Sequence, residues 1–164
     1  KEAQEQDIYK SIIDIGIAQK GVDILDKEFH LGNFKFMHGH FWYGDMIMPS
    51  KKEVVLFSNL LWSWRYPFYD ITFSYHWHML GMEHVENLTE DLMKKEREKW
   101  WNRYFNLANV KNNKSNQRLI KIALLERALA GILVDKFHLD FSKPQSEIVI
   151  RDRMKEVKKL IQSL

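Results

Sequence analysis

The chain has 164 residues, 45% of them hydrophobic, which describes one folded domain with a single core rather than a disordered segment. It contains no cysteine, which excludes disulfides, thiolate-bound zinc and a thiol nucleophile. The net charge of +3 conceals an acidic, aromatic first half, residues 1–88, and a basic, more aliphatic second half, residues 89–164.

The first half contains two predicted helices around an irregular stretch. Residues 2–29 are predicted to form a helix, because their apolar residues follow one stripe at helical spacing. Residues 30–49 are aromatic and punctuated by glycine, so we expect a long loop or a short hairpin packed against the body. Ser50 and Glu53 have the spacing of a capping box, which predicts a helix that starts there and ends before Pro67.

The rest of the chain favours helices throughout. Residues 68–86 alternate apolar and polar side chains as a strand would, but they also fit a helical stripe, and the lack of turn signals favours helix. Thr89 is a predicted N-cap for the next helix. Residues 117–137 are apolar on most sides, so this helix should lie centrally. A last helix is predicted after Ser142, with Pro144 in its first turn.

These elements predict one all-α domain over residues 1–164, a compact bundle of five or six helices. No apolar run approaches the roughly 18 residues of a spanning helix, and no signal peptide is recognised. The compartment stays open, with the cytoplasm slightly favoured. The chain lacks Gly-x-Ser-x-Gly, phosphate-binding glycine loops and Glu-x-x-His pairs, so we lean toward a non-enzymatic role and expect no cofactor.

Four histidines form two His-x-His pairs, His38 with His40 and His76 with His78. On a strand, residues two apart point to the same side and can hold one metal ion together. On a helix they are rotated by about 200° and cannot share an ion. Because the second pair falls in a predicted helix, we expect no metal at these four low-probability candidates.

Aromatic residues supply the candidate binding surface. Phe41, Trp42 and Tyr43 are consecutive in the predicted loop, where successive side chains diverge, so at least one should stay partly exposed. Trp100 and Trp101 are neighbours on a predicted helix, about 100° apart, so both cannot face the core. Trp and Tyr are favoured where proteins bind one another. These five residues are the predicted binding residues.

The leading hypothesis is a non-enzymatic helical domain that binds a macromolecular partner, a protein or a second copy, through its aromatic first half. One alternative is a small-molecule or metal-binding domain that uses the His-rich segment 30–84. The other is a nucleic-acid-binding module that uses the basic segment 94–159. Acidic residues are interleaved among those basic ones, a pattern typical of a solvated, ion-paired surface.

Overall fold

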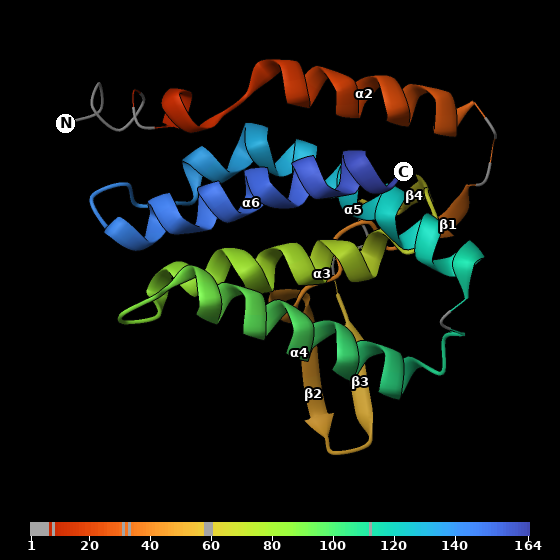
Figure 1. Ribbon diagram of the computed structural model, residues 1–164. Coiled ribbons are helices and arrows are strands. Elements are labelled where there is room, and N and C mark those ends of the chain that lie inside the picture. The colour runs from red at the N-terminus through yellow and green to blue at the C-terminus, as the bar shows by residue number, and fades with distance from the viewer. Residues whose placement is uncertain (1–6, 8, 31, 33, 58–60, 112) are drawn as a thin grey trace.

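Helices make up most of the chain, 68% in the computed structural model, and the predicted all-α bundle is confirmed (Figure 1). The structure describes residues 7, 9–30, 32, 34–57, 61–111 and 113–164. None of the helices in these ranges is long and apolar enough to cross a membrane. The α-helices are α2 (Ile15–Phe29), α3 (Tyr69–Leu80), α4 (Glu90–Ala108), α5 (Lys114–Val134) and α6 (Pro144–Ser163), and short 3-10 turns are η1 (Tyr43–Asp45), η2 (Gly81–His84) and η3 (Asp135–Phe137).

The helix α5 lies at the centre of the bundle, in contact with α2, α3 and α6 (Figure 1). Its Ile122 and Leu125 are completely buried, and so are Val149, Ile150 and Val157 of α6. The central place predicted for residues 117–137 follows from this apolar surface. The helix α4 lies at the outside, against α3 and α6.

Side-chain caps set most of the helix starts. Thr89 accepts a hydrogen bond from the amide of the third residue of α4, as predicted, and Pro144 is the first residue of α6. Asn113 caps α5, which therefore begins three residues earlier than predicted. Asp14 caps α2, so the predicted helix 2–29 is interrupted at residues 13–14. Residues 2–6 and 8 of the predicted helix lie outside the described part of the chain.

The segment 68–86 is helical, as favoured, in α3 and η2. The helix predicted between Ser50 and Pro67 is wrong, because the described residues of this segment form strands and turns; residues 58–60 lie outside the described part of the chain. The strand β2 (Met46–Ser50) pairs antiparallel with β3 (Glu53–Leu56), and β1 (Lys35–Met37) pairs antiparallel with β4 (Ser63–Arg65).

The physical reason lies in the side chains. Ser50 and Glu53 face each other across a two-residue turn instead of forming a capping box. The residues beside them, such as Val54 and Val55, are β-branched and prefer extended backbone. In the described part of the stretch 30–49, for which a loop or hairpin was expected, β1 is followed by a loop that leads into a hairpin extending to Leu56; residues 31 and 33 lie outside the described part.

We predict that Gly131→Ala destabilises the protein by about 2 kcal/mol or more, although alanine favours helix by about 1 kcal/mol. A Cβ at Gly131 would overlap the ring of the buried His76. The matched control is Gly21→Ala in α2, whose Cβ would lie 2.9 Å from a Leu129 methyl group that can rotate away. Urea unfolding of both variants checks this, and equal stability of the two would contradict the predicted overlap.

Candidate functional site

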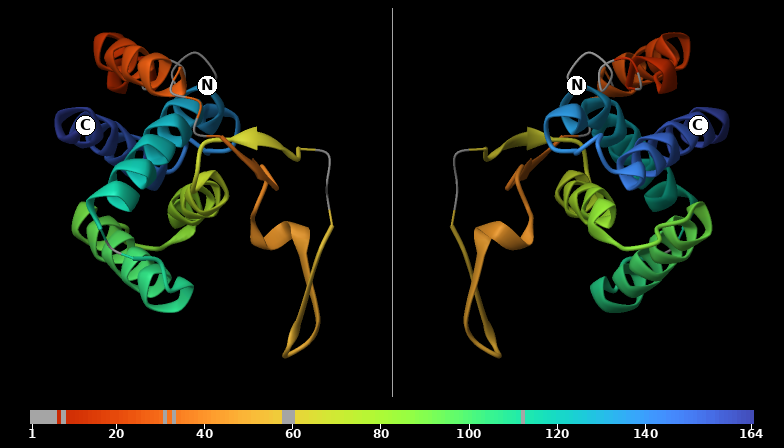
Figure 2. Two further views of the ribbon diagram at one scale, coloured as in Figure 1. Left: turned by 90° about the vertical axis from the view of Figure 1, so that its right-hand side faces the viewer. Right: turned by 90° about the vertical axis from the view of Figure 1, so that its left-hand side faces the viewer.

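A two-stranded arm projects sideways from the helical bundle (Figure 2). We call this hairpin, residues 46–57, the β arm. Its apolar side chains point out from both faces, and Met48 is 65% exposed. Neither face therefore rests on the helical body. The exposed apolar residues of the β arm are Ile47, Met48, Val54, Val55, Leu56 and Phe57.

Among the described residues, β2 pairs with β3 and with no further strand, so each strand of the β arm has an outer edge with unpaired backbone groups. An isolated two-stranded hairpin is marginally stable in water, and open edges readily accept another strand. Lys51 and Lys52 form the turn at the tip of the arm. Lysine is common at exposed strand edges, where its charge opposes uncontrolled pairing with other chains. The arrangement is suited to association with another chain.

The loop that leads into the β arm is held on α3. Asp70, in the first turn of α3, accepts hydrogen bonds from the amides of His38 and Gly39, at 2.9 and 2.7 Å. His40 bonds to Asp45 at 2.5 Å through Nδ1. These bonds fix the base of the arm on a rigid element, which lowers the entropy that a partner has to remove on binding.

The three consecutive aromatic residues have different surroundings. Tyr43 is 78% exposed, whereas Phe41 and Trp42 are half-buried. The ring of Trp42 packs against Trp77 of α3, with centroids 5.2 Å apart. It also occupies the place that a side chain at Gly44 would need. Trp42 therefore helps to attach the loop to the bundle, and Tyr43 is the residue of the three that is exposed to solvent.

The structure does not bring Trp100 and Trp101 to the β arm. Both are half-buried on α4 and pack against Tyr75, with ring centroids 5.3 and 5.2 Å away. The helix α4 and the β arm lie on different sides of the bundle (Figure 2). The five predicted binding residues thus belong to two separate surfaces.

An exposed aromatic patch on β1 and β4 was missed by the sequence reasoning. It consists of Phe36, Trp62 and Trp64, and Trp64 is 68% exposed. Phe36 lies opposite Trp64 in the strand pair, with ring centroids 5.9 Å apart. Trp62 and Trp64 alternate with a polar residue, but they were assigned to the predicted helix, and Phe36 was assigned to the aromatic stretch 30–49. This patch extends the apolar surface on the side of the molecule from which the β arm projects.

The four candidate metal ligands are dispersed. His38 and His40 lie in the loop, where His40 is engaged with Asp45. His76 and His78 are on α3, and they bond to carboxylates on different elements, Asp135 in η3 and Glu96 in α4. Among the described residues no three His, Asp or Glu side chains are grouped as a metal site would require.

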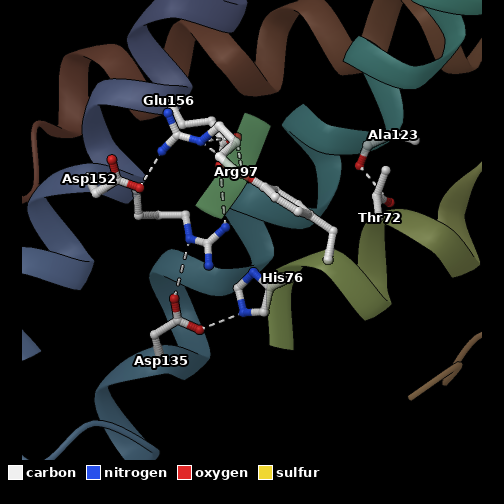
Figure 3. A network of polar contacts seen from close by, with 9 residues as sticks. Thr72, His76, Arg97, Ala123, Asp135, Asp152 and Glu156 are labelled. Atoms are coloured by element: carbon white, nitrogen blue, oxygen red, sulfur yellow. Dashed lines mark hydrogen bonds and ion pairs between the residues drawn. The ribbon is translucent and has the colours of Figure 1, made fainter. Parts of the chain in front are cut away.

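His76 belongs instead to a buried polar network (Figure 3). Its Nε2 donates to Asp135 at 2.8 Å, and Asp135 also forms an ion pair with Arg153 at 3.6 Å. Burial and the charge of Arg153 lower the pKa of His76 to about 3, so the ring is neutral. Burial opposes ionisation of Asp135, but its hydrogen bond from His76 and the charge of Arg153 lower its pKa.

The network continues to α4. Arg153 pairs with Glu156 at 3.5 Å, and Glu156 accepts a hydrogen bond of 2.8 Å from the hydroxyl of Tyr75. The same hydroxyl accepts from Arg97, which also pairs with Asp152. Side chains from α3, α4, η3 and α6 therefore hold one another by charge and hydrogen bonds inside the bundle (Figure 3). Their burial and mutual pairing indicate a structural framework rather than a site open to substrate.

We predict effects of different size for two alanine substitutions in the loop. Trp42→Ala should lower the free energy of unfolding by about 1 to 3 kcal/mol, because the ring packs on Trp77. Tyr43→Ala should change it by less than about 0.5 kcal/mol, because the ring is solvated. Thermal or urea unfolding measures both. A large loss with Tyr43→Ala would mean that the exposed ring is covered in solution.

We also predict a pH dependence that depends on His76. Its pKa is about 3 in the folded chain against an ordinary 6.5, so between these values the unfolded chain binds more protons and acid destabilises the fold. Relative to a His76→Gln variant, the wild type should lose up to about 3 kcal/mol between pH 6.5 and 4, at about 1.4 kcal/mol per pH unit.

The comparison with His76→Gln is needed because Glu126 titrates in the opposite sense. Burial raises its pKa to about 7, so its contribution to stability falls as the pH rises from 4.5 to 7. Urea unfolding at several pH values measures the difference between wild type and variant, with His30→Gln, an exposed histidine, as the control. A constant difference between wild type and His76→Gln over this range would show that His76 titrates normally.

Comparison with known proteins does not identify the site. No family model, curated protein or solved structure matches it. What the domain does has to be inferred from its own side chains, of which the exposed apolar groups of the β arm and the aromatic patch are the most unusual for a protein surface.

Proposed function

We propose that this chain is a non-enzymatic binding domain that captures a protein partner, or a second copy of itself, on the β arm. The observation that supports this most strongly is the exposure of apolar side chains on both faces of the arm. Contiguous apolar surface of this kind on a monomer is typical of an interaction site. Tyr43 and the aromatic patch supply the large rings found at binding hot spots.

The β arm suits recognition by strand addition. A partner segment in extended conformation would pair with the open edge of β2 or β3 through main-chain hydrogen bonds, and apolar side chains on both faces would contact it. The anchoring of the loop on Asp70 holds the arm in one orientation. The helical bundle then serves as the scaffold that presents the arm.

Nucleic-acid binding through residues 94–159 has less support. Many of the basic side chains in that segment are engaged with acids, as in the pairs Arg97–Asp152, Lys155–Glu90 and Arg151–Glu147. Phosphate binding requires positive charge that is free to replace counterions. The His-rich segment 30–84 likewise has three of its four candidate ligands bonded to carboxylates of this chain.

The proposal is tested by site-specific photocrosslinking in the native cells. The photoreactive residue p-benzoylphenylalanine replaces Met48 or Val55 on the β arm, or Leu107 on α4 as an equally apolar and 74% exposed control. We expect discrete crosslinked products, to a partner or to a second copy, from the two arm positions and not from position 107. Strand pairing and exposed apolar contact place these positions within a partner's reach.

Two outcomes would contradict the proposal. One is the absence of any discrete product from positions 48 and 55 when the chain is folded and expressed. The other is the same set of products from Leu107, which would mean that the crosslinks report random collisions of exposed side chains.

A further inference from the structure

The helices α4 and α6 lie on the side of the bundle away from the β arm, with α5 between them (Figure 2). There α4, α5 and α6 surround a cavity of about 460 Å³. Trp101 and Phe105 form its wall on α4, Ile120 and Leu124 its wall on α5, and Leu160 its wall on α6. The volume and the mainly apolar lining are those of small-molecule sites. This site is independent of the function proposed for the arm.

The aromatic wall has a defined geometry. The rings of Trp101 and Phe105 are one helical turn apart, with centroids separated by 6.0 Å. Trp101 is in turn supported from behind by Tyr75, whose hydroxyl is bonded into the buried network. The wall is therefore held in place without a ligand, which lowers the entropic cost of binding.

Positive charge lies along the border of the cavity. Lys121, Lys155 and Lys159 line it, and only Lys155 has an acidic partner, Glu90 at 2.6 Å. Lys121 reaches a backbone carbonyl, and Lys159 makes no hydrogen bond or ion pair within the described part of the chain. The acidic residue in the lining, Glu156, is already engaged in the buried network. Two ammonium groups thus remain without a counter-charge.

We propose that this cavity binds a small organic anion with an apolar body, a carboxylate or a sulfonate. Its apolar part lies against Trp101, Phe105 and Leu124, and its anionic group lies between Lys121 and Lys159. The anion supplies the charge that the two lysines lack, and the apolar walls supply most of the contact area.

Two fluorescent probes that differ in one group test this. The probe 1-anilinonaphthalene-8-sulfonate has an aromatic body and one negative charge, and N-phenyl-1-naphthylamine has the same body without the charge. We expect Lys121→Gln and Lys159→Gln each to weaken binding of the sulfonate about threefold to tenfold, and to leave the uncharged probe unaffected. Titrations with excitation of tryptophan report energy transfer to the bound probe from the tryptophans of the chain, of which Trp101 lines the cavity.

Matched variants locate the binding. Lys158→Gln removes a charge from the same helix, but Lys158 pairs with Asp14 at 3.7 Å outside the cavity, so binding should not change. The double variant Met48→Thr/Val55→Thr on the β arm should also bind the sulfonate normally. Leu124→Trp fills the cavity and should abolish binding of both probes, with the urea midpoint showing whether this variant folds; if it does not, the lysine variants decide.

The anion's role is checked by displacement. Octanoate should displace the sulfonate probe at a lower concentration than octanol. The proposal is overturned by equal binding in all lysine variants, by parallel loss of the uncharged probe, or by loss of the signal in the arm variant. It is also overturned if a synthetic helical peptide of Leu and Glu displaces the probe at a lower concentration than octanoate, because the cavity would then be a protein-docking groove.

Discussion

The buried ion pair between Asp135 and Arg153 is the constraint on which the arrangement of the helices depends. Both side chains are almost inaccessible to water, and leaving either one unpaired would cost several kcal/mol. Asp135 follows α5 and Arg153 belongs to α6, so the pair sets how these two helices meet. His76 bonds to the same carboxylate and brings α3 into the same arrangement.

The helix α3 connects this framework to the surface proposed for binding. One side of α3 directs Tyr75 and His76 into the network, and another directs Asp70 and Trp77 toward the loop. Thr72 adds a bond of 3.4 Å to a carbonyl of α5 (Figure 3). The β arm thus stands on a helix that is fixed from behind, which is how rigid scaffolds present binding loops.

The buried network also explains why some basic side chains at the surface have acidic partners and others do not. Arg97, Arg153 and Glu156 come from sequence stretches that resemble solvated helix faces, yet they turn inward and bond one another. Arg97 holds α4 to α6, and the cavity beside Trp101 lies next to this contact, with Arg97 in its lining. Lys121 and Lys159 at the border of this cavity have no acidic partner among the described residues, because Glu156 in the lining is already engaged inside.

The sequence by itself determined most of the helices, since these follow from local rules. The cap at Thr89, the proline that starts α6 and the apolar surface of α5 each act within a few residues, so their effect could be predicted. The separation of His76 from His78 also follows from the sequence, because side chains two residues apart on a helix point in different directions.

Only the tertiary structure decided the β arm and the buried network. The spacing of Ser50 and Glu53 fits a helix cap and a hairpin turn equally well. The pairing of β1 with β4, which joins segments almost 30 residues apart, favours the hairpin. The network joins residues as distant as Tyr75 and Glu156, which share no motif. Burial turns such separated charges into partners, because a charge removed from water has to find its opposite wherever the fold places it.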